Sequence, residues 1–164
     1  MKIESFYLQT PIGRLLISCE GNKVIEVNLG MDNKKNGQVL ARGTSRLKSR
    51  FAQKVGNQIN HYFDGSSTRF DLDLLVQGTD YQKLVWQCIS AIKWGETLTY
   101  SDIAEQLDSS ARAVGNACRA NPVPIIVPCH RVVAKSGLGG FAGQREGNNI
   151  SVKTWLLEHE CRVS

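Results

Sequence analysis

The chain has 164 residues, of which 41% are apolar, and its 20 Lys and Arg against 15 Asp and Glu leave a net charge of +5. This length allows one medium domain or two small ones with a real hydrophobic core. Because no run of about 18 apolar residues occurs and the first residues lack a signal-peptide pattern, we expect neither a membrane span nor export. Five scattered cysteines, without disulfide density or C-x-x-C spacing, favour reduced thiols in a cytoplasmic protein.

The first half of the chain predicts a small α+β unit. Three short strands are expected at residues 2–9, 14–20 and 23–29. Pro11 and Gly13 interrupt the first gap, and Gly21-Asn22 makes the second gap a tight hairpin. A fourth strand is expected at 68–75.

A helix is predicted between the third and fourth strands. It begins near Thr44 or Ser45 and ends before Gly65, because apolar residues four apart place one stripe on a helix face. The stripe consists of Leu47, Phe51, Val55 and Ile59.

The same region carries most of the excess positive charge. No acidic residue occurs from Asn33 to Phe63, whereas seven basic residues do: Lys34, Lys35, Arg42, Arg46, Lys48, Arg50 and Lys54. We interpret this run as a solvated helix face, with a polyanionic partner as the alternative. Residues 85–164 are nearly neutral, with eight Lys and Arg against seven Asp and Glu.

After Gln77-Gly78 the pattern becomes helical, and we place a domain boundary there, between residues 1–76 and 77–164. Thr79 and Gln82 have the spacing of a capping box. Apolar residues then recur at helical intervals up to Gly95, namely Tyr81, Leu84, Val85, Cys88, Ile89 and Ile92. Cys88 is interpreted as a core residue.

Residues 98–122 predict two short helices around the polar turn Asp108-Ser109-Ser110, with Asn121-Pro122 closing the second. Two short helices joined by a tight turn indicate a helix-turn-helix. The expected inner faces are Ile103 and Leu107 in the first helix and Ala111, Val114 and Cys118 in the second.

In DNA-binding versions of this motif the second helix lies in a groove. The small residues Ala113, Gly115 and Ala117 would let a DNA backbone come close, while Arg112 reaches outward. A helical hairpin that binds nothing is the alternative. The chain continues with a glycine-rich loop at 137–143 and a last helix from Ser151 to about His159. One face of that last helix is Val152, Trp155, Leu156 and His159.

The segment V-P-I-I-V-P-C-H-R-V-V at 123–133 places Cys129 beside His130 and Arg131. A thiol stays weakly ionised at neutral pH unless a cation, a helix N-terminus or a base stabilises its thiolate. Neighbouring side chains of an extended chain point to opposite sides, so His130 serves Cys129 only if the backbone turns or a water bridges them. An acid would be needed to fix the tautomer of His130, and Glu158 and Glu160 are the candidates. For a lone buried cysteine the alternative is inert packing.

This combination of segments resembles the O6-alkylguanine-DNA alkyltransferases, also called methylated-DNA–protein-cysteine methyltransferases. The second half carries the resemblance through G-E-T-L-T-Y-S-D-I-A at 95–104, A-R-A-V-G at 111–115, R-A-N-P-V-P-I at 119–125, I-I-V-P-C-H-R-V-V at 125–133 and K-T-W-L-L-E-H-E at 153–160. The first half agrees more loosely, through T-P-I-G at 10–13 and H-Y-F-D-G at 61–65.

The resemblance implies an α+β fold, with a ribonuclease-H-like antiparallel sheet and helix at 1–76 and a helical domain with a helix-turn-helix at 77–164. It implies direct-reversal DNA repair, in which the cysteine irreversibly takes the alkyl group from O6 of guanine after the base is flipped through the minor groove. O4-alkylthymine is a second candidate substrate. The implied partner is double-stranded DNA containing O6-alkylguanine, and we expect a monomer without a cofactor.

The resemblance also implies roles for individual residues. Cys129 is the nucleophile, His130 the base acting through a water, and Glu160 the acid that orients His130. Tyr100 would lie against the flipped nucleotide and help to protonate the leaving guanine. Asn121 would brace the cysteine loop against the recognition helix.

Other residues are implied to contact the DNA. Arg112 would enter the base stack and replace the extruded guanine, with Ala113 and Gly115 on the same DNA-binding helix. Main-chain groups of Cys129 and Val132 would read the base edge, and the amide of Ala142 would face O6.

Three features depart from the family pattern. Ala142 stands where some members have serine, which removes a side-chain hydrogen bond to O6 but leaves the amide. The polar segment at 144–151 is longer than the usual link to the last helix. Some relatives hold a structural zinc in the first domain, but here that half offers only Cys19 and His61, so we predict no metal.

Three other classes of protein compete with this interpretation. An alkyltransferase-like lesion sensor binds and flips the base without reacting, but such proteins lack the cysteine that Cys129 supplies. A transcription factor would leave the Pro-Cys-His-Arg string unexplained. A cysteine hydrolase would leave the helix-turn-helix without a use.

Overall fold

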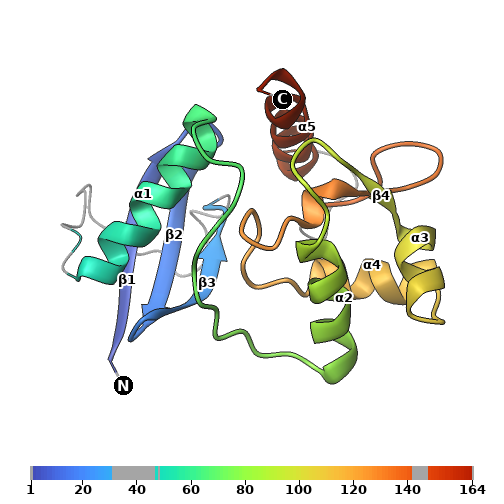
Figure 1. Cartoon of the computed structure of the whole chain (residues 1–164), viewed down its shortest axis with the longest axis horizontal. Helices are drawn as coiled ribbons and strands as arrows, with labels where there is room; N and C mark the ends of the chain where they lie inside the picture. The colour runs from blue at the N-terminus through green and yellow to red at the C-terminus, as the bar shows by residue number, and fades with distance from the viewer. Residues whose placement is uncertain (1, 31–46, 48, 142–147, 164) are drawn as a thin grey trace. The chain divides into compact units, whose positions relative to one another are not determined.

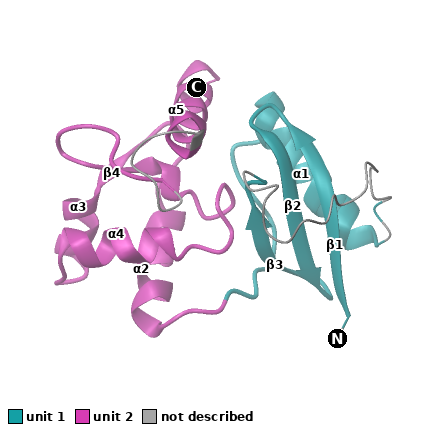
Figure 2. Ribbon diagram, turned by 180° about the vertical axis from the view of Figure 1, so that it is seen from behind, with its two compact units in different colours: residues 1–76 teal, residues 77–164 magenta. Residues whose placement is uncertain are grey.

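The computed structural model describes residues 2–30, 47, 49–141 and 148–163. It divides into two compact units, residues 1–76 and 77–164 (Figure 2). Among the described residues, no helix combines the length and the apolar character needed to cross a bilayer.

The first unit is built on a three-stranded antiparallel sheet in the order β1-β2-β3 (Figure 1). Its strands are β1 (Ile3–Thr10), β2 (Gly13–Glu20) and β3 (Lys23–Asn28). Phe6 faces Ile17 across the first strand pair, Ile17 faces Val27 across the second, and all three are buried. These cross-strand neighbours form one apolar row that covers the inner face of the sheet. The three predicted strands are confirmed, with ends that shift by at most one residue.

One helix, α1 (Arg50–Asp64), packs on this sheet. Its N-cap is Ser49, whose hydroxyl accepts a hydrogen bond from the amide of Ala52 at 3.0 Å. The predicted start near Thr44 or Ser45 is therefore wrong, and those two residues lie outside the described part of the chain. Leu47 precedes the helix and lies against Gly56, where a Cβ would come within 3.3 Å of it. The buried face of α1 consists of Ala52, Val55, Gly56, Ile59 and Tyr62.

Residues 68–75 run beside β3 without forming the predicted fourth strand. Leu74 makes a single parallel bridge to Val24. The amide of Val24 donates to the carbonyl of Asp73, and the amide of Leu75 donates to the carbonyl of Val24, both at 2.9 Å. The segment is extended as expected, but it pairs with the sheet edge at only one residue.

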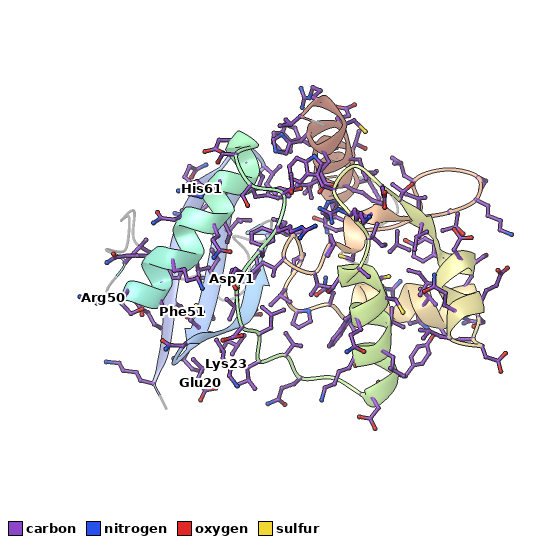
Figure 3. All side chains as sticks on the ribbon, viewed as in Figure 1. Glu20, Lys23, Arg50, Phe51, His61 and Asp71 are labelled. Atoms are coloured by element: carbon purple, nitrogen blue, oxygen red, sulfur yellow. The ribbon has the colours of Figure 1, made fainter. Side chains whose placement is uncertain are left out.

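The basic run is described only in part. Lys34, Lys35, Arg42, Arg46 and Lys48 lie outside the described residues. Lys54 forms an exposed ion pair with Asp71 at 3.0 Å. Figure 3 shows Arg50 and His61 toward opposite ends of α1, and His61 is exposed.

The second unit begins with α2 (Asp80–Ser90), and the predicted capping box between Thr79 and Gln82 is present at its start. Its inward face differs from the prediction, because Leu84 is 49% exposed whereas Trp86 is only 3% exposed. The indole Nε1 of Trp86 donates to the carbonyl of Ala117 at 2.9 Å. A buried indole needs such a partner, so this bond fixes which side of α2 faces the core.

The helix-turn-helix comprises α3 (Tyr100–Gln106) and α4 (Ala111–Arg119), which confirms the two predicted helices (Figure 1). Thr99 and Ser110 cap their N-termini. The predicted inner face of α4 is partly wrong: Ala111 is exposed, and Val114 and Ala117 are the buried residues. Ala117, expected among the small residues that let DNA come close, is only 2% exposed, and its carbonyl accepts from Trp86 of α2.

The remaining elements bring distant segments together. A short parallel pair joins β4 (Leu98–Thr99) to β5 (Val132–Val133), which follows the 3-10 turn η1 (Cys129–Arg131). The last helix, α5 (Asn148–Arg162), begins earlier than the predicted Ser151. On its buried side His159 stacks on Trp155, with ring centroids 4.8 Å apart.

We predict that Trp86→Phe lowers the free energy of unfolding by about 1–3 kcal/mol, because the carbonyl of Ala117 loses its buried donor. Urea denaturation followed by circular dichroism measures the change. Leu84→Ala on the exposed side of the same helix is the control and should shift the midpoint little. Equal effects of the two substitutions would contradict the assigned orientation of α2.

Candidate active site

Cys129 is held by a turn of backbone and not by an extended strand. The η1 turn places Cys129, His130 and Arg131 in a 3-10 conformation, and all three are buried. The amide of Cys129 donates to the carbonyl of Val127 at 2.9 Å. Because the backbone turns here, the objection that adjacent side chains diverge in an extended chain does not apply.

Asn121 clamps the loop that precedes the cysteine. Its Nδ2 donates to the carbonyl of Val127 at 2.9 Å, and its Oδ1 accepts from the amide of Val123 at 3.0 Å. Between these two anchor points Ile125 has a φ of +76°. A β-branched residue is strained in that region and stays there only when its surroundings hold it. Asn121 supplies that restraint from the end of α4.

A buried carboxylate joins His130 and Arg131 to the last helix. Glu160 Oε1 lies 2.6 Å from Nε2 of His130, and Arg131 donates from Nε to Oε2 and from Nη2 to Oε1, both at 2.9 Å. Arg131 also donates from Nη1 to the carbonyl of Ile92 at 2.6 Å. The geometry is bidentate, which is the strongest form of Arg–carboxylate pairing. Glu158, the other candidate acid, is exposed.

The protonation states follow from these contacts. Burial raises the pKa of Glu160, but hydrogen bonds from His130 and Arg131 outweigh it and lower the pKa to about 2. Burial lowers the pKa of His130, against the opposing effect of Glu160. At neutral pH a neutral imidazole therefore faces an ionised carboxylate, which can only accept hydrogen bonds. The proton must sit on Nε2, which leaves Nδ1 as a basic lone pair.

That second nitrogen is available for chemistry. Nδ1 of His130 is buried and makes no hydrogen bond to any described residue. Burial raises the pKa of Cys129, against the lowering effects of the Asn121 side chain, Lys153 and nearby amides. The thiol is therefore protonated in the resting protein, so it needs a base. The unpartnered Nδ1 of His130, next along the chain, is a candidate for that base.

Lys153 is a functional residue that the sequence patterns did not single out. It is fully buried in α5, and its Nζ donates to the carbonyls of Val132 at 2.7 Å, Leu138 at 2.5 Å and Gly140 at 3.0 Å. Burial lowers its pKa to about 8, although the charges of Cys129 and Cys118 favour its protonated form. One ammonium group thus ties the glycine-rich loop to β5 beside the thiol.

A sequence signal for Lys153 exists in retrospect. Lys153, Leu156 and Glu160 are spaced i, i+3 and i+7, so they share one helix face. Two opposite charges on an otherwise apolar face are unusual unless both are paired in the interior. Arg131 was noted as a possible partner of the thiol, but it pairs with Glu160 instead.

The thiol opens onto a cleft of about 900 Å³ between α3, α4 and the glycine-rich loop. Of the predicted site residues, Tyr100, Arg112, Gly115 and Cys129 line it. The hydroxyl of Tyr100 donates to the carbonyl of Gly140 at 3.3 Å. A side chain at Gly139 would come within 2.8 Å of the Tyr100 ring, so only glycine lets the loop lie this close.

The other predicted residues lie around this cleft. Arg112 is exposed on the first turn of α4, and Ala113 is half-buried beside it. A Cβ at Gly115 would meet open space. Val132 is buried, and its carbonyl already accepts from Lys153. Ala142 lies outside the described residues.

The described part of the chain offers no group of three or more His, Cys, Asp and Glu side chains that could hold a metal ion. Cys19, one of two possible ligands in the first unit, is buried in β2. Burial there, with a smaller effect of Glu4, raises its pKa to about 11.

The fold and the cleft together define a class of protein that combines a helix-turn-helix with a buried cysteine, histidine and glutamate. Residues 80–162 match the family model described as the DNA binding domain of 6-O-methylguanine DNA methyltransferase, and residues 3–76 match the ribonuclease-like domain of the same family. The chain belongs to this family.

Individual relatives agree with this assignment over nearly the whole chain. The constitutive methylated-DNA–protein-cysteine methyltransferase of Bacillus subtilis is 35% identical over 159 residues, which cover 95% of this chain and 93% of that protein. The Mycobacterium leprae protein of the same name is 37% identical over 156 residues, which cover 93% and 89%.

Solved structures give the same result. The O6-methylguanine methyltransferase of Mycobacterium tuberculosis matches with a TM-score of 0.81 and 34% identity, covering 99% of this chain and 95% of that one. The OGT protein of the same organism, solved in complex with DNA, matches with a TM-score of 0.76 and 34% identity, covering 96% and 92%.

We predict that Lys153→Met loosens the glycine-rich loop, because Met keeps the length of the side chain but cannot donate to the three carbonyls. Amide hydrogen exchange around Leu138–Gly140 should accelerate, and the free energy of unfolding should fall by about 1–3 kcal/mol. Lys135→Met, at an exposed position just before that loop, is the matched control. Unchanged exchange in Lys153→Met would contradict the tie between α5 and the loop.

Proposed function

We propose that the protein repairs double-stranded DNA containing O6-alkylguanine by moving the alkyl group to Cys129, once per molecule. The observation that carries the proposal is the buried set of Cys129, His130 and Glu160 at a cleft bordered by the second helix of a helix-turn-helix. Membership of a methyltransferase family and relatives named for methylated-DNA–protein-cysteine transfer support it.

The transfer step is an in-line displacement at carbon. The Cys129 thiol gives its proton, through a water, to Nδ1 of His130, and Glu160 stabilises the imidazolium that forms. The thiolate sulfur then bonds to the alkyl carbon while the carbon–O6 bond breaks, and the electron pair of that bond stays on guanine. A thioether does not revert under these conditions, so each molecule reacts once.

The leaving guanine departs more easily as a neutral base than as an anion. Tyr100 borders the cleft with its hydroxyl near the glycine-rich loop, from where it can pass a proton to the departing guanine. Asn121 contributes by holding the cysteine loop in its strained form. Tyr100 therefore acts on the leaving base, and Asn121 acts on the loop that carries the thiol.

The DNA must deliver its base into the cleft, because O6 lies inside the base stack. We assign the approach to α4 through the minor groove: Ala113 and Gly115 allow close contact with the backbone, and the exposed Arg112 enters the stack in place of the extruded guanine. Unstacking requires a few kcal/mol, least for a mispaired lesion, and Arg112 offsets part of it.

Main-chain groups read the base once it is flipped. The carbonyls of Cys129 and Val132 would accept hydrogen bonds from the guanine edge, since a carbonyl oxygen that already accepts from Lys153 keeps a second lone pair. The amide of Ala142 would face O6.

O4-alkylthymine, which presents a similar alkoxy group, is a second substrate of the same mechanism. We propose a cytoplasmic monomer as the active form.

The direct experiment mixes the protein with a duplex containing O6-methylguanine and searches by mass spectrometry for one methyl group on the peptide bearing Cys129. Cys129→Ala should lose transfer but keep DNA binding, because docking and chemistry use different groups. Transfer by Cys129→Ala would refute the assignment of the nucleophile. Binding without transfer by the wild type would favour the lesion-sensor alternative.

We predict that Arg112→Ala slows repair in duplex DNA by at least about tenfold more than reaction with free O6-benzylguanine, because the free base needs no flipping. Rates of thioether formation on the two substrates measure the difference. Lys83→Ala, exposed on α2 and not part of the cleft lining, is the control. Equal losses on both substrates would place Arg112 in the pocket chemistry or in folding.

We predict that Glu160→Gln slows transfer to free O6-benzylguanine by at least about 100-fold, because the neutral amide no longer fixes the tautomer of His130 or stabilises its imidazolium with a negative charge. In the wild type the rate should fall only below pH 6.5, where His130, with its lowered pKa, takes up a proton on Nδ1. Glu158→Gln, exposed on the same helix, should leave the rate unchanged.

The pH profile separates a chemical role of Glu160 from a structural one. Removal of Glu160 also leaves Arg131 unpaired in the interior, so circular dichroism must show that the variant is folded at the assay temperature. A folded Glu160→Gln variant with the wild-type rate and pH profile would contradict the role of this carboxylate.

A further inference from the structure

A second thiol opens onto the same cleft as Cys129 and has no part in the transfer mechanism. Cys118 lies in the last turn of α4, is half-buried, and lines the cleft together with Cys129. Of the other three cysteines, Cys19 belongs to the first unit, while Cys88 on α2 and Cys161 on α5 are not part of the cleft lining.

The two cleft cysteines are fastened to one residue. The amide of Asn121 donates to the carbonyl of Cys118 at 3.2 Å. The side chain of Asn121 donates to the carbonyl of Val127 at 2.9 Å, and the same carbonyl accepts from the amide of Cys129 at 2.9 Å. Asn121 therefore bonds directly to the backbone of Cys118, and it shares the Val127 carbonyl with the backbone of Cys129. The same residue restrains both cysteines.

The electrostatics of the cleft agree with this closeness. Burial and, to a smaller extent, the charge of Cys129 together raise the pKa of Cys118 to about 12, against the lowering effect of Lys153. The charges of both cysteines in turn raise the pKa of Lys153, against the lowering effect of burial. Two thiolates beside each other are unfavourable, whereas one thiolate and one thiol are tolerated. A neighbouring thiolate and thiol form a disulfide only when an oxidant takes two electrons from the pair.

We propose that Cys118 and Cys129 form a reversible disulfide when a small peroxide enters the cleft, so that Cys118 is the resolving thiol for the alkyl-accepting cysteine. The Cys129 thiolate attacks one oxygen of hydrogen peroxide, the O–O bond breaks, and a sulfenic acid and water result once a proton is taken up. The sulfur of Cys118 then attacks the Cys129 sulfur, and the sulfenic oxygen leaves as a second water. Two thiols lose two electrons in all, and the peroxide gains them.

The disulfide has a chemical consequence for the repair site. A sulfenic acid without a neighbouring thiol is oxidised further to sulfinic and sulfonic acids, which thiol reductants do not reverse. With Cys118 beside it, Cys129 is stored as a disulfide that a thiol reductant returns to the active form. Oxidation then suspends alkyl transfer without destroying the single-use sulfur.

The experiment treats the full-length reduced protein with hydrogen peroxide, then unfolds it in guanidinium chloride and blocks the remaining thiols with iodoacetamide, so that buried thiols such as that of Cys19 also react. The number of blocked thiols should fall from five to three. Because Arg119 lies between the two cysteines, trypsin separates them, and mass spectrometry should find one linked pair of peptides containing Cys118 and Cys129. Dithiothreitol should release the pair.

Two variants test whether Cys118 is the thiol that reacts with oxidised Cys129. After peroxide and then dithiothreitol, Cys118→Ala should recover at least about tenfold less reactive Cys129 thiol than the wild type, with sulfinic or sulfonic acid on the Cys129 peptide. Cys88→Ala should behave as the wild type. Overoxidation of Cys129 in the wild type without a linked peptide, or linkage of Cys129 to another cysteine, would overturn the proposal.

These readouts count thiols and peptides, and none of them requires alkyl transfer. A linked pair in a protein that fails to react with O6-methylguanine would leave this inference intact while removing the proposed function. Alkyl transfer in a protein that never forms the linked pair would support the proposed function and refute the disulfide.

Discussion

A single buried carboxylate, that of Glu160, holds the catalytic turn to the last helix. It accepts hydrogen bonds from the imidazole of His130 and, in bidentate fashion, from the guanidinium of Arg131. An ionised carboxylate in the interior requires such partners, because an unpaired buried charge is strongly destabilising. Arg131 supplies the compensating charge, so His130 can remain neutral and keep its Nδ1 lone pair. The same three side chains thus join the turn to the last helix and, in the proposed mechanism, set the protonation state of the base.

The surroundings of the thiol depend on two further restraints that come from different elements of the second unit. Asn121, just after α4, holds the strained loop around Ile125. Lys153, in α5, holds three carbonyls of β5 and the glycine-rich loop. Rigid placement of this kind is what an in-line displacement needs, since a small error in the position of the attacking atom greatly reduces the rate. The protein obtains this placement from polar side chains whose donors and acceptors are paired with main-chain groups.

Strands, turns and caps that depend on residues close in the sequence could be predicted from it. Contacts between residues that only the fold brings together could not. Alternation and tight turns predict the three strands, and the capping box at Thr79 predicts the start of α2. The predicted start of α1 was wrong because the sequence offers several polar residues as caps, whereas Ser49 is held in the fold by the bond from its amide to Glu4. Trp86 was missed because its inward direction depends on a carbonyl of another helix. Cys129 with His130 was visible as a string, whereas the role of Lys153 depends on three carbonyls that the fold brings together.

The central claim is that Glu160 keeps His130 neutral, with its proton on Nε2 and a free base at Nδ1. Nitrogen-15 NMR of the imidazole ring, followed from neutral to acidic pH in the resting wild-type protein, measures tautomer and charge together. The account predicts a neutral ring protonated at Nε2 at pH 7, with protonation of Nδ1 only below pH 6.5. A ring protonated at Nδ1, or an imidazolium already present at pH 7, would contradict it.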